Sequence, residues 1–541
     1  MIILEFPART DRRATLACLG IAAFAGLLWV VASPPIGWWP VGWIALTPTL
    51  WLVDRAPTTR RAALYAWISG STASLVGFRW IATLLATQGG LPWPVGLLGV
   101  LILSAYHGLV MFFMARAIRA LRHRKWPMAA AAPLALVAFE KLLPEVFPYF
   151  LAISQSPVPI AIQVADLAGP YAVTAMIAAS AGAIYDGCMR RRRPGAITAL
   201  ALAAALGYGA IRMHQIDLAR AAAPHAKVAL ISSGVAASTS DRGDRETLLD
   251  QLAKLQQSTA AAEAAGAELT VWSEAAYPIL LPHELTHDLA ERSPYRIRRG
   301  FTGPAIIGAL TGGRTGAPWN SALSLGTDDR ILARHDKVHR VLGSEYNPIV
   351  EWWPSAESWM PSGAGHLAAG DEAVALPVVI RGAAYQLGAM ICFEDILPVS
   401  GRALAALHPN LLVNLTEDSW FGPDEPWQHL GLAVFRAVEV RADLVRAVNL
   451  GPSSMVDAAG RIVATGPMIG GAPQTLLVDV ALVDGGGTVY AAIGDVFAWG
   501  CAIPTLGLWL WPWLRRRRWW RPLQHAPGSA PGGRGRRKRT R

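Results

Sequence analysis

The residues best suited to chemistry lie at the ends of short apolar segments in the second half of the chain. Cys392 follows the apolar run YQLGAMI, and Glu394 and Asp395 follow it closely. A cysteine attacks as its thiolate, and neighbouring carboxylates raise the pKa of a thiol. Cys392 is therefore either an inert packed residue, or a nucleophile to which another part of the chain supplies a base and a positive charge.

Two other segments offer those groups. Glu274 follows the apolar segment LTVWS, and Lys337 and Glu345 lie in ARHDKVHRVLGSEYNP. Covalent catalysis by a thiol requires a group that takes its proton, and a cation or N–H donors that stabilise the oxyanion. Each residue alone has an ordinary structural explanation, such as a packed cysteine, a surface lysine or a loop acid. The ordered set of acid, lysine and cysteine favours catalysis.

A competing site lies in the segment PHELTHDLAER. His283, Glu284 and His287 match the pattern H-E-x-x-H, in which one helix presents two zinc ligands and a general base. Pro282 could begin such a helix. The pattern is short, and no third ligand stands in a matching context. A membrane zinc protease is therefore kept as an alternative.

The elements that must position these residues fall into two kinds, and the first is membrane-embedded. The chain has 541 residues, of which 53% are hydrophobic and 16% charged, and its mean hydropathy is +0.32. A helix crosses a bilayer with about 20 apolar residues. Apolar runs of about that length or somewhat shorter predict eight spans, seven in residues 1–215 and one in 483–512, near 14–34, 36–53, 62–87, 92–115, 127–143, 158–188, 195–213 and 489–512.

The net charge of +11 sits largely in short clusters beside these runs. Clusters of Arg and Lys alternate from loop to loop, as the positive-inside rule requires, and this pattern disfavours nucleic-acid binding. Both termini are then cytoplasmic, and residues 226–482 lie on the extracytoplasmic side. Residues 513–541 are expected to form a basic, disordered cytoplasmic tail. The four cysteines show no paired spacing, so we expect neither a disulfide framework nor a cysteine zinc site.

The second kind of element is an α/β layer. In residues 226–482, short apolar strands alternate with helical patterns at 245–267 and 425–448. Such alternation favours an α/β layered domain. The expected strands are KVALIS, ELTVWS, AIIGAL, YQLGAMIC and NLLVNL.

Several motifs carry a family resemblance. The order of Glu274, Lys337 and Cys392, each at a strand end, resembles the Glu-Lys-Cys set of the nitrilase superfamily. The stretches NLTEDSWFGPDEPWQHL and FRAVEVRADLVRAVNLGPSS resemble conserved runs of one of its branches. With a multi-span block before this domain and one span after it, the chain resembles the apolipoprotein N-acyltransferase family up to about residue 512.

The resemblance implies a nitrilase-like α-β-β-α sandwich outside a bacterial cytoplasmic (inner) membrane. It implies transfer of an acyl chain from a phospholipid, phosphatidylethanolamine being the expected donor, to the N-terminal amine of a diacylglyceryl-cysteine apolipoprotein. The reaction would be ping-pong through a cysteine thioester. Neither a metal nor a cofactor is implied, and a monomer is expected. The alternatives within this fold are a membrane-tethered amidase, an acyltransferase with another amine acceptor, and a catalytically inactive relative.

The resemblance also assigns roles. Cys392 would attack the ester, and Glu274 would accept the thiol proton. Lys337 would stabilise the oxyanion with the N–H of Phe393, and Glu345 would orient the lysine or shuttle protons.

Glu394 would support the site without contacting substrate, because Lys337 would offset its charge. Some positions depart from the family pattern. Phe393 stands where the family has Tyr, and Glu417 with Asp418 replaces an Asn-Asp pair. Residues 355–365 are expected to contribute to a mobile lid.

Overall fold

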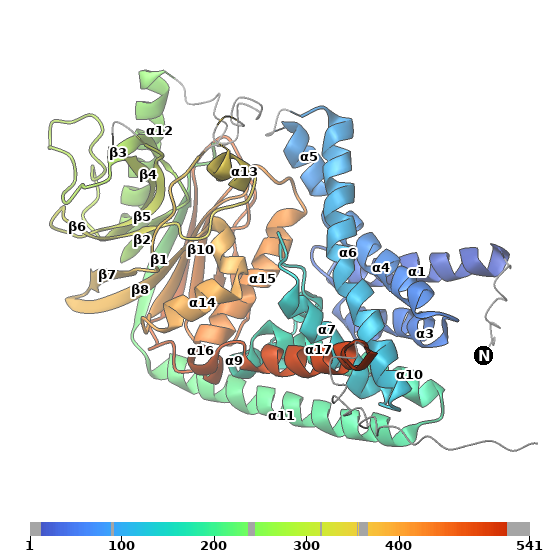
Figure 1. Ribbon diagram of the computed structural model, residues 1–541. Coiled ribbons are helices and arrows are strands. Elements are labelled where there is room, and N and C mark those ends of the chain that lie inside the picture. The colour runs from blue at the N-terminus through green and yellow to red at the C-terminus, as the bar shows by residue number, and fades with distance from the viewer. Residues whose placement is uncertain are drawn as a thin grey trace, which may run out of the picture.

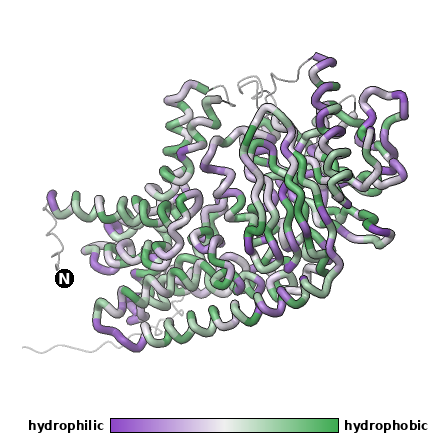
Figure 2. Tube along the Cα trace, turned by 180° about the vertical axis from the view of Figure 1, so that it is seen from behind, coloured by the Kyte–Doolittle hydropathy of each residue, from purple (hydrophilic) through white to green (hydrophobic). Residues whose placement is uncertain are grey.

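The computed structural model describes residues 12–87, 91–235, 244–313, 316–353, 355 and 366–516. It has a helical part and an α/β part lying side by side (Figure 1). The hydropathy colouring shows long hydrophobic stretches along the helices, while hydrophilic residues gather in the outer loops of the α/β part (Figure 2). The predicted lid, apart from Ser355, and residues 517–541 of the predicted tail lie outside the described residues.

The helical part contains three helices, α1, α6 and α11, that are long and apolar enough to cross a membrane. Other predicted spans are interrupted. The run at 36–53 is split at Leu46, where α2 ends and a proline-containing first turn begins α3. The count of eight spans therefore remains a prediction. The helices are α1 (Arg12–Ala32), α2 (Trp39–Ala45), α3 (Thr47–Arg55), α4 (Thr59–Gly77), α5 (Trp80–Thr87), α6 (Trp93–His123), α7 (Met128–Leu142), η1 (Leu151–Gln155), α8 (Pro159–Ile162), α9 (Ala165–Ala168), α10 (Pro170–Cys188), α11 (Arg192–Ala222), α16 (Val489–Ile493) and α17 (Val496–Arg516).

The α/β part is built on two sheets. The first has the order β13-β1-β2-β4-β5-β6, with β3 beside β4, and the second has the order β12-β11-β10-β9-β8-β7. The strands are β1 (His225–Ser232), β2 (Leu269–Trp272), β3 (Tyr277–Pro282), β4 (Ala305–Gly312), β5 (Trp319–Leu325), β6 (Ile331–Asp336), β7 (Ala375–Ile380), β8 (Ala383–Ile391), β9 (Leu411–Glu417), β10 (Leu444–Asn449), β11 (Ser454–Val456), β12 (Ile462–Thr465) and β13 (Gln474–Ala481).

Helices cover the outer faces of both sheets. Apolar residues from the facing sides of the two sheets form one core. The helix α12 (Arg245–Ala264) packs on the first sheet. The helices α14 (Pro398–Ala405) and α15 (Glu425–Val440) pack on the second sheet. The order helix, sheet, sheet, helix is the predicted α-β-β-α sandwich. Two short helices lie in its loops, α13 (Pro348–Trp352) and η3 (Cys392–Ile396).

The helix α15 also joins the two parts. Its buried side chains belong to the same apolar cluster as those of the helical part, for example Phe435 on α15 and Ile153 on η1. Figure 1 shows α15 between the sheets and the remaining helices. The second sheet is therefore held against the helical part by a shared apolar core.

Most predicted elements of the α/β part are confirmed, with one correction. Each of the five expected strands corresponds to an observed one, and α12 ends just before Gly266, whose φ is +96°. The helix predicted over 425–448 is too long, because α15 ends at Val440. Arg441 takes the left-handed conformation with φ +60°, and residues 444–449 form the buried strand β10. The apolar run continues because both elements are buried.

Candidate active site

Each of the three predicted catalytic residues follows the end of a strand. Glu274 comes two residues after β2, Lys337 directly after β6, and Cys392 directly after β8. The chain turns sharply at two of these ends, since Ala275 has φ +46° and Cys392 has φ +50°. Residues other than glycine rarely adopt this conformation, and it is concentrated at functional sites. The turn at Cys392 ends the strand and presents the thiol at its tip.

Lys337 stands between two carboxylates. Its Nζ lies 2.6 Å from Oε1 of Glu345 and 3.3 Å from Oε1 of Glu274, and Asn320 donates a 2.6 Å hydrogen bond to the same oxygen of Glu274. The Lys337 side chain is 1% exposed. Burial opposes its charge, but the two carboxylates more than offset this, so the pKa of Lys337 lies well above its usual value. The lysine therefore stays protonated.

Cys392 lies in the same electrostatic environment. Burial raises the pKa of its thiol, the charge of Glu274 raises it further, and Lys337 lowers it. The net effect is a pKa well above the usual value, so the resting thiol is neutral. Burial likewise raises the pKa of Glu274, with Lys337 acting in the opposite direction. A neutral thiol becomes a nucleophile only when a nearby base takes its proton.

Glu394 answers the question that the sequence raised about acids beside the thiol. Its carboxylate accepts hydrogen bonds from the main-chain N–H groups of Ile391, Val338 and His339 at 2.8, 2.8 and 3.1 Å, and its Oε2 lies 3.2 Å from Nε2 of His335. Burial alone would raise its pKa, but His335 and these N–H groups hold the pKa of Glu394 below its usual value. Through these hydrogen bonds Glu394 connects the segment after Lys337 to the turn at Cys392.

The zinc site of the alternative interpretation is not formed. His283 and Glu284 lie in a turn after β3, and His287 lies in an isolated β-bridge, so the segment is not a helix. His283 Nε2 contacts Asp336 at 3.0 Å, and the Glu284 side chain is 96% exposed. Without a helix, the i and i+4 spacing does not place the two histidines on one face. The zinc-protease alternative is therefore wrong.

Replacing Glu394 by glutamine should lower both transfer activity and stability. The amide keeps one acceptor oxygen and turns an NH₂ group toward N–H donors, and each buried donor left unpaired costs about 1 to 3 kcal/mol. We expect activity to fall by about tenfold or more. Acyl transfer and the midpoint of thermal unfolding in detergent would measure both effects.

The matched control for this prediction is Glu284→Gln. It makes the same chemical change at an exposed side chain, and we expect wild-type activity and stability. A zinc-protease mechanism would reverse the order, because Glu284 would then be the general base. Equal losses in both variants would contradict the role of Glu394.

A second buried network of hydrogen bonds lies beside the turn at Cys392, and the sequence did not indicate its contacts. Asp395 accepts from Arg446 Nε at 2.8 Å and contacts His429 Nε2 at 2.7 Å. Asn414 Nδ2 donates to the carbonyl of Cys392 at 3.3 Å. These partners lie 34 and 51 residues beyond Asp395 for the histidine and the arginine. The only sequence signal was that His429 and Arg446 lie within the two motifs of the family resemblance.

Glu417, one of the departures from the family pattern, makes hydrogen bonds at the ends of the neighbouring strands β9 and β10. It accepts from Asn449 Nδ2 at 2.6 Å and from the N–H of Ser419 at 2.9 Å. Asn449 in turn accepts from the N–H of Gly234 at 2.9 Å. Burial raises the pKa of Glu417 to about 8. The residue therefore links the ends of β9 and β10 to the segment after β1.

Comparison with known proteins assigns both parts of the chain. Residues 25–183 match the family model of the apolipoprotein N-acyltransferase N-terminal domain, and residues 231–486 match that of carbon-nitrogen hydrolases. The apolipoprotein N-acyltransferase of Geobacter metallireducens is 30% identical over 502 residues, which cover 89% of this chain and 92% of the relative. That of Rhizobium leguminosarum bv. trifolii is 28% identical, covering 82% and 86%. Among solved structures, a carbon-nitrogen hydrolase from Helicobacter pylori G27 matches 54% of this chain and 95% of its own at 14% identity, with a TM-score of 0.35.

Proposed function

This chain belongs to the apolipoprotein N-acyltransferase family, and we propose that it transfers an acyl chain from a phospholipid to the N-terminal amine of an apolipoprotein through a thioester on Cys392. The observation that carries the mechanism is the buried cluster in which Lys337 contacts both Glu274 and Glu345 within electrostatic reach of the thiol. Such a cluster provides a base and a cation for one nucleophile.

The first half-reaction forms the thioester. Glu274 takes the thiol proton as sulfur attacks the ester carbonyl of the phospholipid. The negative charge that develops on the carbonyl oxygen is stabilised by Lys337 and by the N–H of Phe393. When the carbon–oxygen bond breaks, Glu274 returns the proton to the leaving alkoxide, and a lysophospholipid is released. Glu345 holds Lys337 in place at 2.6 Å.

The second half-reaction transfers the acyl chain to nitrogen. The amine of the diacylglyceryl-cysteine attacks the thioester in its neutral form, and the same oxyanion groups act again. Glu274 takes the proton from nitrogen and gives it to the departing sulfur, which restores the thiol. Because the amine arrives from water as an ammonium ion and leaves as an amide, each turnover releases one proton.

The donor should reach the thiol from the helical part. Phe393, next to the nucleophile, packs edge-on against Phe147 at 5.7 Å between ring centroids. Trp80 packs edge-on against Phe147 at 5.6 Å and against Phe421 at 5.3 Å. These rings form an apolar wall between the two parts of the protein, suited to an acyl chain. We place the enzyme in the bacterial inner membrane as a monomer, with this site on the extracytoplasmic side.

A trapping experiment tests the thioester. Detergent-purified protein is incubated with phosphatidylethanolamine and no acceptor, and acyl adducts are mapped by peptide mass spectrometry. We expect a hydroxylamine-sensitive acyl group on Cys392, which a diacylglyceryl-cysteine peptide then discharges as an amide. Discharge by water at the same rate would indicate an amidase. Absence of an adduct, under conditions that acylate an active N-acyltransferase, would contradict the mechanism.

A further inference from the structure

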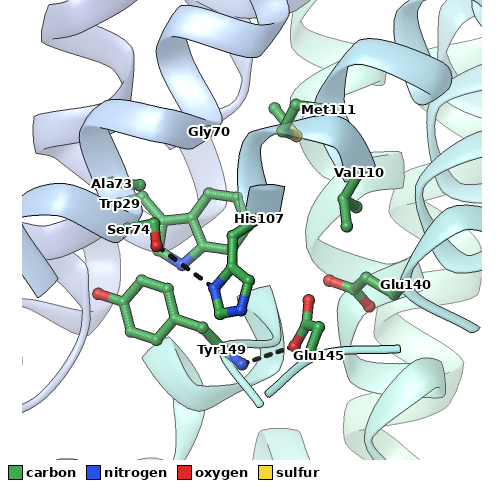
Figure 3. Close-up of a pocket in the computed structure, with 10 residues that line it drawn as sticks. All are labelled: Trp29, Gly70, Ala73, Ser74, His107, Val110, Met111, Glu140, Glu145 and Tyr149. Atoms are coloured by element: carbon green, nitrogen blue, oxygen red, sulfur yellow. Dashed lines mark hydrogen bonds between the residues drawn. The ribbon is translucent and has the colours of Figure 1, made fainter. Parts of the chain in front are cut away.

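A small cavity lies within the helical part, lined by apolar side chains and a few polar groups, and includes none of the residues of the proposed mechanism. It is enclosed by α1, α4, α6, α7 and the segment that follows α7 (Figure 3). Its volume is about 20 Å³. A cavity of this size has room for about one or two water molecules where polar groups can bind them.

Two buried nitrogen atoms that line this cavity lack a hydrogen-bond partner within the described residues. His107 is 7% exposed, and its Nδ1 contacts Ser74 Oγ at 3.3 Å while its Nε2 is unpartnered. Trp29 is also 7% exposed, and its Nε1 is unpartnered. Leaving such groups unpaired costs about 1 to 3 kcal/mol each. A water molecule in the cavity would give each of these two nitrogen atoms a hydrogen-bond partner.

Two carboxyl groups share the cavity. Figure 3 shows those of Glu140 and Glu145 facing each other beside the ring of His107. Glu140 accepts a 3.2 Å hydrogen bond from the N–H of Leu151, and Glu145 accepts one of 2.8 Å from the N–H of Tyr149. Each carboxyl group thus has a main-chain donor.

No cation pairs with either carboxyl group among the ion pairs of the described residues. Lys141 pairs with Asp495 at 2.6 Å, and Arg79 pairs with Asp424. Another buried acid of the helical part, Asp166, differs because Arg441 and Arg212 contact it at 2.7 and 3.0 Å. The Glu140 and Glu145 pair is therefore uncompensated by positive charge.

Ionisation of both facing carboxyl groups is disfavoured, because each opposes the charge of the other and burial opposes the charge of Glu140, which is 4% exposed, more than that of the half-buried Glu145. We propose that this cavity is a proton-binding site, in which one or two water molecules and the Glu140–Glu145 pair hold at least one proton. The other titratable groups that face the pair are His107 on α6, Tyr149 in the following segment and Tyr171 on α10. The unpartnered His107 Nε2 offers a further hydrogen-bonding position for the bound water.

The proton also fixes the wall of the acyl site. The two carboxyl groups accept from Tyr149 and Leu151, so they anchor the segment that carries Phe147, the ring packed on Phe393. Removing the proton would place two negative charges face to face and loosen this anchor. This consequence rests on the proposed function, whereas the proton site itself does not.

Infrared spectroscopy of the full-length protein in detergent tests the proton site directly. A protonated carboxyl group gives a carbonyl stretch that an ionised one lacks. We expect this band at neutral pH to weaken in Glu140→Gln or in Glu145→Gln, both near-isosteric changes, but not in the exposed control Glu284→Gln. Two variants are used so that the test can still be made if one of them fails to fold. Spectra of both folded variants that superimpose on the wild-type spectrum would overturn the proposal.

Single-turnover acylation of Cys392 from phosphatidylethanolamine tests the coupling. The wild type and Glu140→Gln share the titrations of Cys392 and Lys337, so the ratio of their rates isolates the cavity. The glutamine stays neutral, and we expect the ratio of variant to wild type to rise at alkaline pH, by up to about tenfold per pH unit for one titrating group. A constant or falling ratio would overturn the coupling. Failure of both proteins to acylate would contradict the proposed function and leave the infrared result to decide the proton site.

Discussion

Cys392→Ala should abolish the acyl adduct and lower acyl transfer by more than about 10³-fold, because no other group on the described residues replaces the attacking sulfur. The turn at Cys392 makes this loss specific. The thiol sits at the tip of a strand in a left-handed conformation, and the carbonyl beneath it is held by Asn414. Alanine keeps the Cβ and leaves that turn intact, so the variant should fold. Labelled acyl transfer from phospholipid to a diacylglyceryl-cysteine peptide would measure the loss.

The chain offers a control for this substitution. Cys188 ends α10 and is exposed, so Cys188→Ala changes the same atoms away from the site and should leave transfer unchanged. Cys392→Ser is informative as well. A hydroxyl ionises far less readily than a thiol, so serine should acylate very slowly even with Glu274 and Lys337 in place. Transfer by Cys392→Ala within tenfold of wild type would exclude the thioester route.

Glu274 and Cys392 could be proposed as catalytic residues from the sequence because each follows an apolar strand that is visible in it. Apolar strands such as those before Glu274 and Cys392 stand out from polar surroundings, whereas the strand before Lys337 ends in the polar residues RHD, and strand ends are where side chains of several strands meet. The contacts between these side chains could not be predicted. Glu394 bonds to residues 55 and 56 positions away, and only the fold brings them together. The sequence therefore offered candidates for the reacting groups and Glu394 as a supporting residue, but it did not give the contacts by which Glu394 joins the two segments.

Errors arose where one pattern is compatible with two structures. The stretch 425–448 is apolar at helical spacing, yet Arg441 ends the helix and β10 follows. The segment beginning at His283 has the spacing of a zinc helix, yet it forms a turn after β3. The spacing of residues along the sequence indicates which side chains would lie on one face of a helix if a helix formed. It does not measure whether tertiary contacts favour a helix there.

The membrane spans illustrate the same limit. Hydropathy found the apolar runs, but it does not report the continuity of helical hydrogen bonds. The run at 158–188 becomes three helices, α8, α9 and α10, two of which begin at prolines, Pro159 and Pro170. Proline lacks the N–H that would continue a preceding helix. Composition therefore predicted that this part of the chain is apolar. The division of the apolar runs into separate helices follows from backbone features such as prolines.

Lys337→Met should lower both half-reactions by about 10³-fold or more, since loss of one oxyanion donor alone costs about 10² to 10³. Methionine has a similar length and no charge. In its place, Glu274 and Glu345 would lie together in a buried site without the cation that both contact. One of them would take up a proton, and a protonated Glu274 cannot accept the proton of the thiol. The substitution therefore removes the oxyanion cation and disables the base together.

Separate measurement of thioester formation and of its discharge would test this double role. Lys254→Met is the control, because Lys254 is half-exposed and pairs with Asp250 on its own helix, and it should behave as the wild type. Lys337→Arg should not restore activity, because the larger guanidinium must fit a site where the lysine is 1% exposed. If Lys337→Met slowed discharge alone, the lysine would serve only the second step. If both steps stayed within tenfold of wild type, the cation that the oxyanion needs would have to come from another residue, and the buried contacts of Lys337 would be structural.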